Sequence, residues 1–120
     1  MAVTQFGFMG LILLHPKAFG VHRATEEDFE GFCHLWRGLG YLLGIEDEYN
    51  FCRGSVADIR KRCQDFIEHF GIPRLATVTK DWEHMSRCLI SGAGFWLLIM
   101  PFEAPLMFLA DILGLSMPRV

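Results

Sequence analysis

Apolar residues recur at helical spacing along most of the chain, and the alternation that is typical of β-strands is weak throughout. Residues 3–14 are apolar on nearly every side, which predicts a short buried helix. Thr25–Asp28 ("TEED") is a variant of the capping box, with acidic side chains where the helix dipole favours them. It predicts the start of a second helix that extends to about residue 43. The expected fold class is all-α.

A third helix is predicted by its cap and by the residues that follow it. Ser55 and Asp58 form a second capping pattern, and apolar residues then follow one stripe as far as Phe70. Gly71 and Pro73 are expected to end this helix, because glycine favours the position after a last turn and proline lacks a backbone N–H.

The last third of the chain is strongly apolar. A fourth helix is expected to end before Pro101, and a short fifth helical segment covers about residues 105–113. Residues 89–109 contain a single charged side chain and are long enough to cross a bilayer as a transmembrane helix. Because Pro101 would break such a helix, the alternative is a helical hairpin over residues 86–113 that is buried or packed at a membrane interface. With no linker or repeat, residues 1–120 are interpreted as one unit of about five helices.

Composition narrows the class of protein. An apolar content of 52% requires a well-buried core, a partner or a bilayer. The net charge of −3 and the absence of a basic stripe argue against a nucleic-acid partner. The four cysteines form no CxxC pair and are interpreted as free or buried thiols rather than as a disulfide framework. No hydrolase or kinase motif is present, and Glu46–Glu48 is interpreted as a solvated acidic loop.

His34 is the candidate metal ligand. The apolar stripe of its helix is expected on the opposite side and comprises Phe29, Phe32, Trp36, Leu39 and Leu43. Gly31 and Gly38 flank His34 one turn before and one turn after it, which clears a shelf where a planar macrocycle could approach the imidazole. Arg37 could then pair with a carboxylate of that cofactor. The alternative is that His34 simply belongs to the exposed face of an amphipathic helix.

Three stretches resemble the mpaB/rubber oxygenase catalytic domain family. They are Thr4–Phe8 ("TQFGF"), His22–Asp28 ("HRATEED") and His34–Asp47 ("HLWRGLGYLLGIED"). That family includes the bacterial latex-clearing enzymes and an endoplasmic-reticulum-bound fungal oxygenase. The resemblance covers about residues 4–52 and is nearest to animal, arthropod-like members.

The resemblance implies a globin-like helical bundle with haem b, whose iron takes its axial ligand from His34. It implies that Gly31, Arg37 and Gly38 contribute to cofactor binding and that Thr4 lies near the haem pocket as a catalytic residue. The implied activity is dioxygen-dependent cleavage of carbon–carbon double bonds in an isoprenoid or lipid-like substrate. The implied location is a membrane such as the endoplasmic reticulum, or otherwise the cytoplasm.

The resemblance also implies that the chain covers the C-terminal part of the domain. A family arginine and glutamate that are tied to activity precede the threonine matched by Thr4, and Val3 stands where the latex-clearing enzymes have a lysine. A chain of this extent is expected to lack part of the haem pocket. The alternative function is that of a non-catalytic, membrane-associated helical protein.

Overall fold

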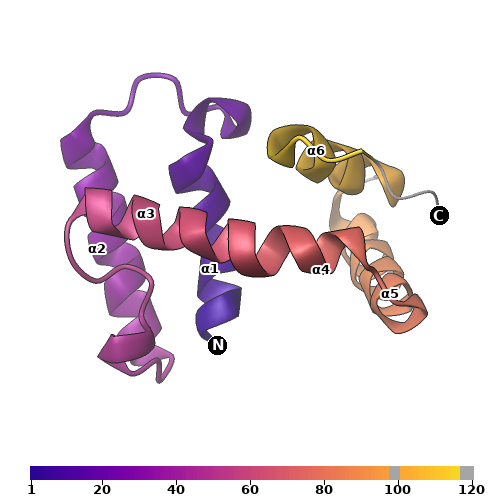
Figure 1. Cartoon of the computed structure of the whole chain (residues 1–120), viewed down its shortest axis with the longest axis horizontal. Helices are drawn as coiled ribbons and strands as arrows, with labels where there is room; N and C mark the ends of the chain where they lie inside the picture. Colours follow the sequence, from indigo (N-terminus) through magenta and orange to yellow (C-terminus); the bar gives the residue numbers. More distant parts are fainter. Residues whose placement is uncertain (98–100, 117–120) are drawn as a thin grey trace. The chain divides into compact units, whose positions relative to one another are not determined.

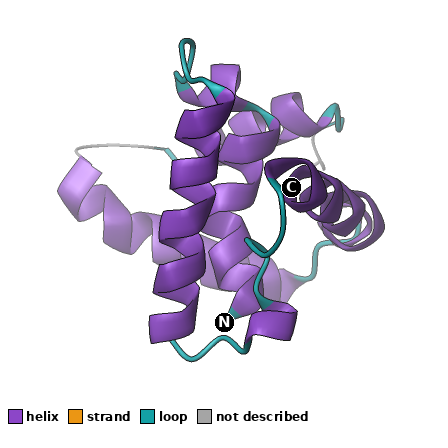
Figure 2. Ribbon diagram, turned by 90° about the vertical axis from the view of Figure 1, so that its left-hand side faces the viewer, coloured by secondary structure: helices purple, strands orange, loops and turns teal. Residues whose placement is uncertain are grey.

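The computed structural model describes residues 1–97 and 101–116, and every regular element in this part of the chain is helical (Figures 1 and 2). In chain order these are α1 (Ala2–Leu14), η1 (Pro16–Phe19), α2 (Glu26–Leu42), η2 (Asp47–Tyr49), α3 (Val56–Phe66), η3 (Ile67–Gly71), α4 (Ile72–Ala76), α5 (Lys80–Leu97) and α6 (Glu103–Leu113). The expected all-α class is therefore confirmed for the described residues. The chain divides into two compact units, Met1–His69 and Phe70–Val120.

Helices α2 and α3 begin at capping boxes, as their sequences predicted. The Asp28 N–H donates to Thr25 Oγ1 over 3.2 Å, and Asp28 Oδ2 accepts from the Thr25 N–H over 2.7 Å. Ser55 and Asp58 repeat this reciprocal pair at the start of α3. The hydrogen bonds that Thr25 donates lower the pKa of the Asp28 carboxyl, because they stabilise its ionised form.

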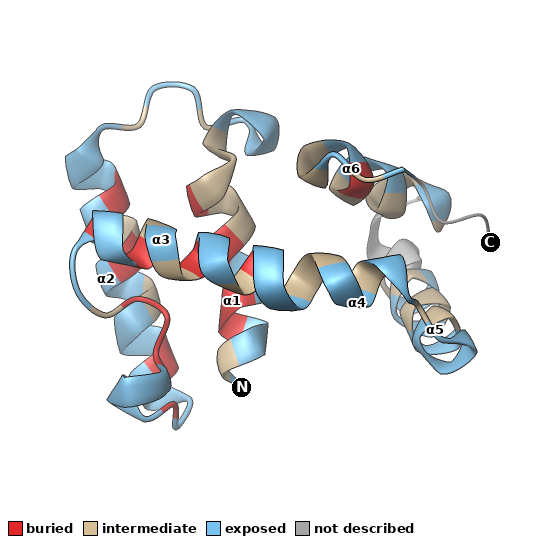
Figure 3. Cartoon of the chain, viewed as in Figure 1, coloured by how far each residue is buried: buried red, intermediate tan, exposed pale blue. Residues whose placement is uncertain are grey.

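The core of the first unit lies between α1, α2 and α3 (Figure 3). The buried apolar side chains on these helices are Phe6, Met9 and Leu13 of α1, Phe29 and Cys33 of α2, and Val56, Ile59 and Cys63 of α3. The rings of Phe6, Phe51 and Phe66 pack against one another with centroids 4.6–5.5 Å apart. Aromatic contacts of this kind add to the burial of apolar area, so they hold the ends of α1 and α3 together.

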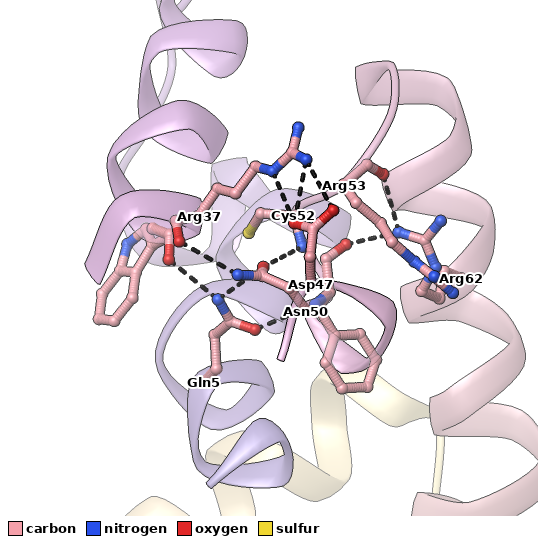
Figure 4. Close-up of polar contacts among 9 residues, drawn as sticks. Gln5, Arg37, Asp47, Asn50, Cys52, Arg53 and Arg62 are labelled. Atoms are coloured by element: carbon pink, nitrogen blue, oxygen red, sulfur yellow. Dashed lines mark hydrogen bonds and ion pairs between the residues drawn. The ribbon is translucent and has the colours of Figure 1, made fainter. Parts of the chain in front are cut away.

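Gln5 is a buried polar residue of α1 that reaches two other parts of the first unit (Figure 4). Its Nε2 donates to the backbone carbonyl of Trp36 in α2 over 2.9 Å and to Asn50 Oδ1 over 3.0 Å. Its Oε1 accepts from the Phe51 N–H over 3.0 Å. Both ends of the amide are therefore used, which is required of a polar group in a core.

Asn50 completes this buried pair of amides. Its Nδ2 donates to the backbone carbonyl of Arg37 over 3.1 Å, and its Oδ1 also accepts from the Cys52 N–H over 3.0 Å. The Gln5–Asn50 pair thus ties α1 to the backbone of α2 and to the turn that precedes α3.

Gly40 makes that close approach to α2 possible. A Cβ at this position would lie 2.6 Å from Gln5 Nε2 and 2.8 Å from Asn50 Nδ2. The buried face of α2 is centred on Phe29, Cys33 and Gly40, so it overlaps only part of the expected apolar stripe. Of that stripe Phe29 is buried, and Phe32 and Trp36 are half-buried. Leu39 and Leu43, which that stripe placed in the core, are exposed. The apolar pattern alone did not locate the whole contact face, because Gly40 contributes to it through its backbone and has no side chain.

The third helix does not end where glycine and proline predicted. The chain continues from α3 through the π-helical segment η3 into α4, and Gly71 keeps a right-handed helical φ of −67°. Pro73 lies in the first turn of α4. Backbone N–H groups in a first turn have no partner within their own helix, so proline can occupy this position without loss of a hydrogen bond. Proline here starts a helical segment, so the expected end at Gly71 and Pro73 is wrong.

The prediction of a transmembrane helix over residues 89–109 is also wrong. Helix α5 ends at Leu97 and α6 begins at Glu103, while residues 98–100 lie outside the described part of the chain. None of the described helices is both long enough and apolar enough to cross a membrane. The physical reason is that the apolar run is shared between two helices, and α5 begins with the charged residues Lys80, Asp81 and Glu83.

Replacing Gly40 with alanine tests whether α2 packs closely against the Gln5 and Asn50 amides. We expect Gly40→Ala to lower the free energy of unfolding by about 1–3 kcal/mol, because the new methyl group would displace the Gln5 and Asn50 amides. Gly38→Ala is the matched control on the same helix, since a Cβ there meets nothing within 4 Å. It should raise stability by about 0.5–1 kcal/mol through helix propensity. Urea denaturation followed by circular dichroism measures the free energy of unfolding of both variants. Equal changes in Gly40→Ala and Gly38→Ala would contradict the close packing at Gly40.

Asn50→Asp tests the amide pair itself. The new carboxylate would face the Arg37 carbonyl without a donor, so we expect a loss of about 2–4 kcal/mol at neutral pH. Burial should raise the pKa of this carboxyl in the folded state. The loss relative to the native chain should therefore shrink as the pH falls through that pKa, because the protonated carboxyl can donate again. Denaturation of both proteins at several pH values checks this, and a pH-independent difference would count against it.

Candidate functional site

His34 lies on the exposed side of α2, and Gly31, Arg37 and Gly38 are exposed with it. A Cβ at Gly31 or Gly38 would meet nothing within 4 Å, so neither glycine is required by packing within the described residues. This distinguishes them from Gly40, six residues after His34 on the buried side of the same helix. The structure therefore leaves open space beside His34 in both directions along α2.

A surface depression of about 590 Å³ adjoins His34 within the first unit. Its wall includes Gly31, His34 and Arg37 of α2, as well as Cys33, Cys52 and Ile59. Glu27 and Glu30 line it one to two turns before His34. Three of the four predicted cofactor-binding residues thus share one concave surface, whereas Gly38 is not among its lining residues.

Arg37 is held by an ion pair with Asp47 of η2. Its Nε and Nη2 donate to Asp47 Oδ1 over 3.1 and 2.9 Å, and Nη2 also donates to Asp47 Oδ2 over 3.0 Å (Figure 4). Both side chains remain well exposed, so solvent screens the pair and its contribution to stability is small. Arg37 is consequently positioned at the depression by an ion pair that is open to solvent.

Thr4 is exposed on α1 and does not line the depression. Its neighbour Gln5 points into the core instead, where it makes the hydrogen bonds described above. The structure therefore does not bring Thr4 and His34 to one concave surface among the described residues. The catalytic role that the resemblance implies for Thr4 stays a prediction.

Several large apolar side chains of α2 are exposed on or beside the His34 side. They are Leu35, Tyr41 and Leu42, and Leu42 is 78% exposed. At 100° per residue, Leu35 and Leu42 project from the side of α2 on which Gly31 and Gly38 lie. The space beside His34 is thus bordered by apolar groups as well as by glycines.

His34 offers a single imidazole as a ligand. Within residues 1–97 and 101–116, no group of three or more His, Cys, Asp and Glu side chains is arranged to hold a metal ion. A structural zinc site needs about four protein ligands, whereas haem supplies four nitrogen ligands itself and needs only an axial group from the protein. Among the described residues, His34 is therefore a lone imidazole and not part of a cluster of protein ligands.

The sequence treated the cysteines only as free or buried thiols, and the structure shows that two of them belong to the depression. Cys33 and Cys52 both line it. The interaction with Cys52 lowers the pKa of the Cys33 thiol, and the interaction with Cys33 together with burial raises the pKa of the Cys52 thiol. Burial raises the pKa of Cys63 to about 12. The spacing of 19 residues between Cys33 and Cys52 gave no signal that they line one depression.

The second unit contains a separate cavity of about 410 Å³. Its lining is largely apolar and includes Leu75, Trp82, Phe102, Leu106 and Leu109. The volume falls within the range of small-molecule sites, roughly 300–1,000 Å³. None of the predicted site residues lines this cavity.

Comparisons of the chain with protein-family models, with curated proteins and with solved structures found no match. The resemblance to the mpaB/rubber oxygenase family therefore remains a prediction.

A double-mutant cycle tests whether Arg37 is free to change partners. Unfolding of the native chain, Arg37→Ala, Asp47→Ala and the double variant should give a coupling energy of about 0.2–1 kcal/mol. The coupling should also decrease as salt is added, because the pair is exposed. A salt-independent coupling of several kcal/mol would show instead that the pair is a structural element which another carboxylate could not replace.

Proposed function

We propose that this chain carries the haem-binding helix of an oxygenase of the mpaB/rubber oxygenase type, with His34 as the axial ligand of the iron. The observation that carries the proposal is the pair of exposed glycines, Gly31 and Gly38, on either side of an exposed histidine. Packing within the described residues accounts for Gly40 but for neither of these two.

Gly31 and Gly38 lower the stability of α2. Glycine in a helix interior is less favourable than alanine by about 0.8–1.0 kcal/mol, so Gly31 and Gly38 together weaken α2 by roughly 2 kcal/mol. No neighbouring atom offsets this loss, since a Cβ at either position would lie in open space. A flat ligand resting against the helix backbone beside His34 would supply a reason for both glycines.

The surrounding residues fit the parts of a haem. His34 offers the imidazole, Leu35 and Leu42 offer apolar contact for the ring, and Arg37 can pair with a carboxylate once Asp47 is displaced. Glu27 and Glu30 would repel a carboxylate at their end of the depression, which favours its placement at Arg37. When bound, haem supplies the activation of dioxygen, while the chain holds and orients the ring.

The proposed reaction is oxidative cleavage of a carbon–carbon double bond in an isoprenoid or lipid-like substrate. Its support is the resemblance of residues 4–52 to the oxygenase family, together with the exposed apolar groups beside His34. On the same resemblance, Thr4 is proposed to act in the haem pocket of the complete domain.

Haem titration of the full chain, followed by absorption in the Soret region, tests the assignment of His34. The native chain should develop a ligand-bound Soret band, and His34→Ala should weaken haem binding by more than about tenfold. His69→Ala is the matched control, because it removes another exposed histidine from the same unit and should change nothing. An unchanged spectrum and affinity in His34→Ala would falsify the assignment.

Gly38→Leu tests the shelf separately from the ligand. The leucine enters open space and favours the helix, so circular dichroism should show the fold retained. Haem affinity should nevertheless fall about tenfold or more, because the side chain occupies the place of the ring. Native affinity in this variant would mean that the ring does not lie against Gly38.

A further inference from the structure

Helix α5 of the second unit carries a histidine and a cysteine about one turn apart, and the proposed function uses neither of them. His84 and Cys88 are both exposed. Their side chains lie against each other, with Cys88 Sγ 3.8 Å from His84 Nε2. Residues four apart on a helix are neighbours, and two ligands at this spacing can bind one metal ion. The pair therefore presents a thiol and an imidazole to the same region of solvent.

The separation of these two atoms is close to the one that a zinc ion requires. Zinc binds cysteine sulfur at about 2.3 Å and histidine nitrogen at about 2.0–2.1 Å, in tetrahedral geometry, which places the sulfur and nitrogen about 3.6 Å apart. Cys88 Sγ and His84 Nε2, at 3.8 Å, need a movement of only about 0.2 Å to reach this separation. Thiolate and imidazole ligands also favour zinc over Mg²⁺ and Ca²⁺, which prefer oxygen ligands.

His84 and Cys88 supply only half of such a site. Zinc in structural sites has four protein ligands, whereas residues 1–97 and 101–116 contain no group of three or more His, Cys, Asp and Glu side chains that could hold a metal ion. A second copy of the chain can supply the two missing ligands, because the same two side chains are exposed on its own α5.

The surface of α5 beside the pair is suited to contact with a second copy of this helix. Met85 and Leu89 are apolar, yet they are 72% and 75% exposed. Gly92, one turn after Cys88, is also exposed, and a Cβ there would meet nothing within 4 Å among the described residues. Two α5 helices that meet at Cys88 would remove apolar area from water, and glycine permits a close approach of their backbones. These neighbours favour a second chain over water as the source of the remaining ligands.

We propose that His84 and Cys88 are half of a zinc site, and that one Zn²⁺ joins two copies of the chain through two imidazoles and two thiolates. Each Cys88 thiol loses its proton to solvent on binding, so one Zn²⁺ releases two protons and no electrons are transferred. The inference does not depend on the proposed function, because it concerns the second unit and requires neither haem nor His34.

Zinc titration of the full chain, reduced with a phosphine and free of haem, tests the proposal. Calorimetry should give about one Zn²⁺ per two chains. Sedimentation should show the mass of one chain without zinc and of two chains with it. Co²⁺ in place of Zn²⁺ should give the d–d bands of a tetrahedral ion and the charge-transfer bands of thiolate ligands.

Variants of α5 assign the ligands. His84→Ala and Cys88→Ser should each weaken zinc binding by more than about tenfold and abolish the zinc-dependent dimer. Both side chains are exposed, so circular dichroism should show the fold retained. His22→Ala removes another exposed histidine and should bind zinc as the native chain does. Native zinc affinity in either α5 variant would overturn the proposal, and so would a zinc-saturated native chain that stays monomeric or a Co²⁺ spectrum without thiolate bands.

Discussion

The first unit depends on one buried polar contact, the pair of amides formed by Gln5 and Asn50. Five hydrogen bonds leave this pair or join it, and they link α1 to the carbonyls of Trp36 and Arg37 in α2 and to the turn before α3. A half-satisfied amide in a core costs about 1–3 kcal/mol, so these segments must keep their relative positions. Gly40 is required for the same reason, because any side chain there would occupy the place of the amides.

The same pair organises the candidate site on the other side of α2. It fixes the backbone around Arg37 and the turn that carries Cys52, while His34 projects to solvent from the opposite side of the helix. On one side of α2, Gly40 is required by the close contact with Gln5 and Asn50. On the other side, Gly31 and Gly38 face open space.

Much of the secondary structure could be predicted because its causes are local. Thr25 with Asp28 and Ser55 with Asp58 start α2 and α3 through contacts between residues three apart. The errors arose where tertiary context decides the outcome. Pro73 opens α4 after a π-helical turn, and the apolar run after Cys88 is divided between α5 and α6 within the described residues. Leu39 and Leu43 fit the apolar periodicity of α2 and are nevertheless exposed.

The sequence by itself determined the helical class, the starts of α2 and α3, and His34 with its flanking glycines as the residues to examine. The packing of the helices was needed to show that Gly40 serves packing while Gly31 and Gly38 do not, and that Cys33 and Cys52 line the same depression. The physical reason is distance along the chain. Caps and periodicity depend on neighbours within about one helical turn, whereas Gln5 and Asn50 are 45 residues apart and meet only when three helices pack.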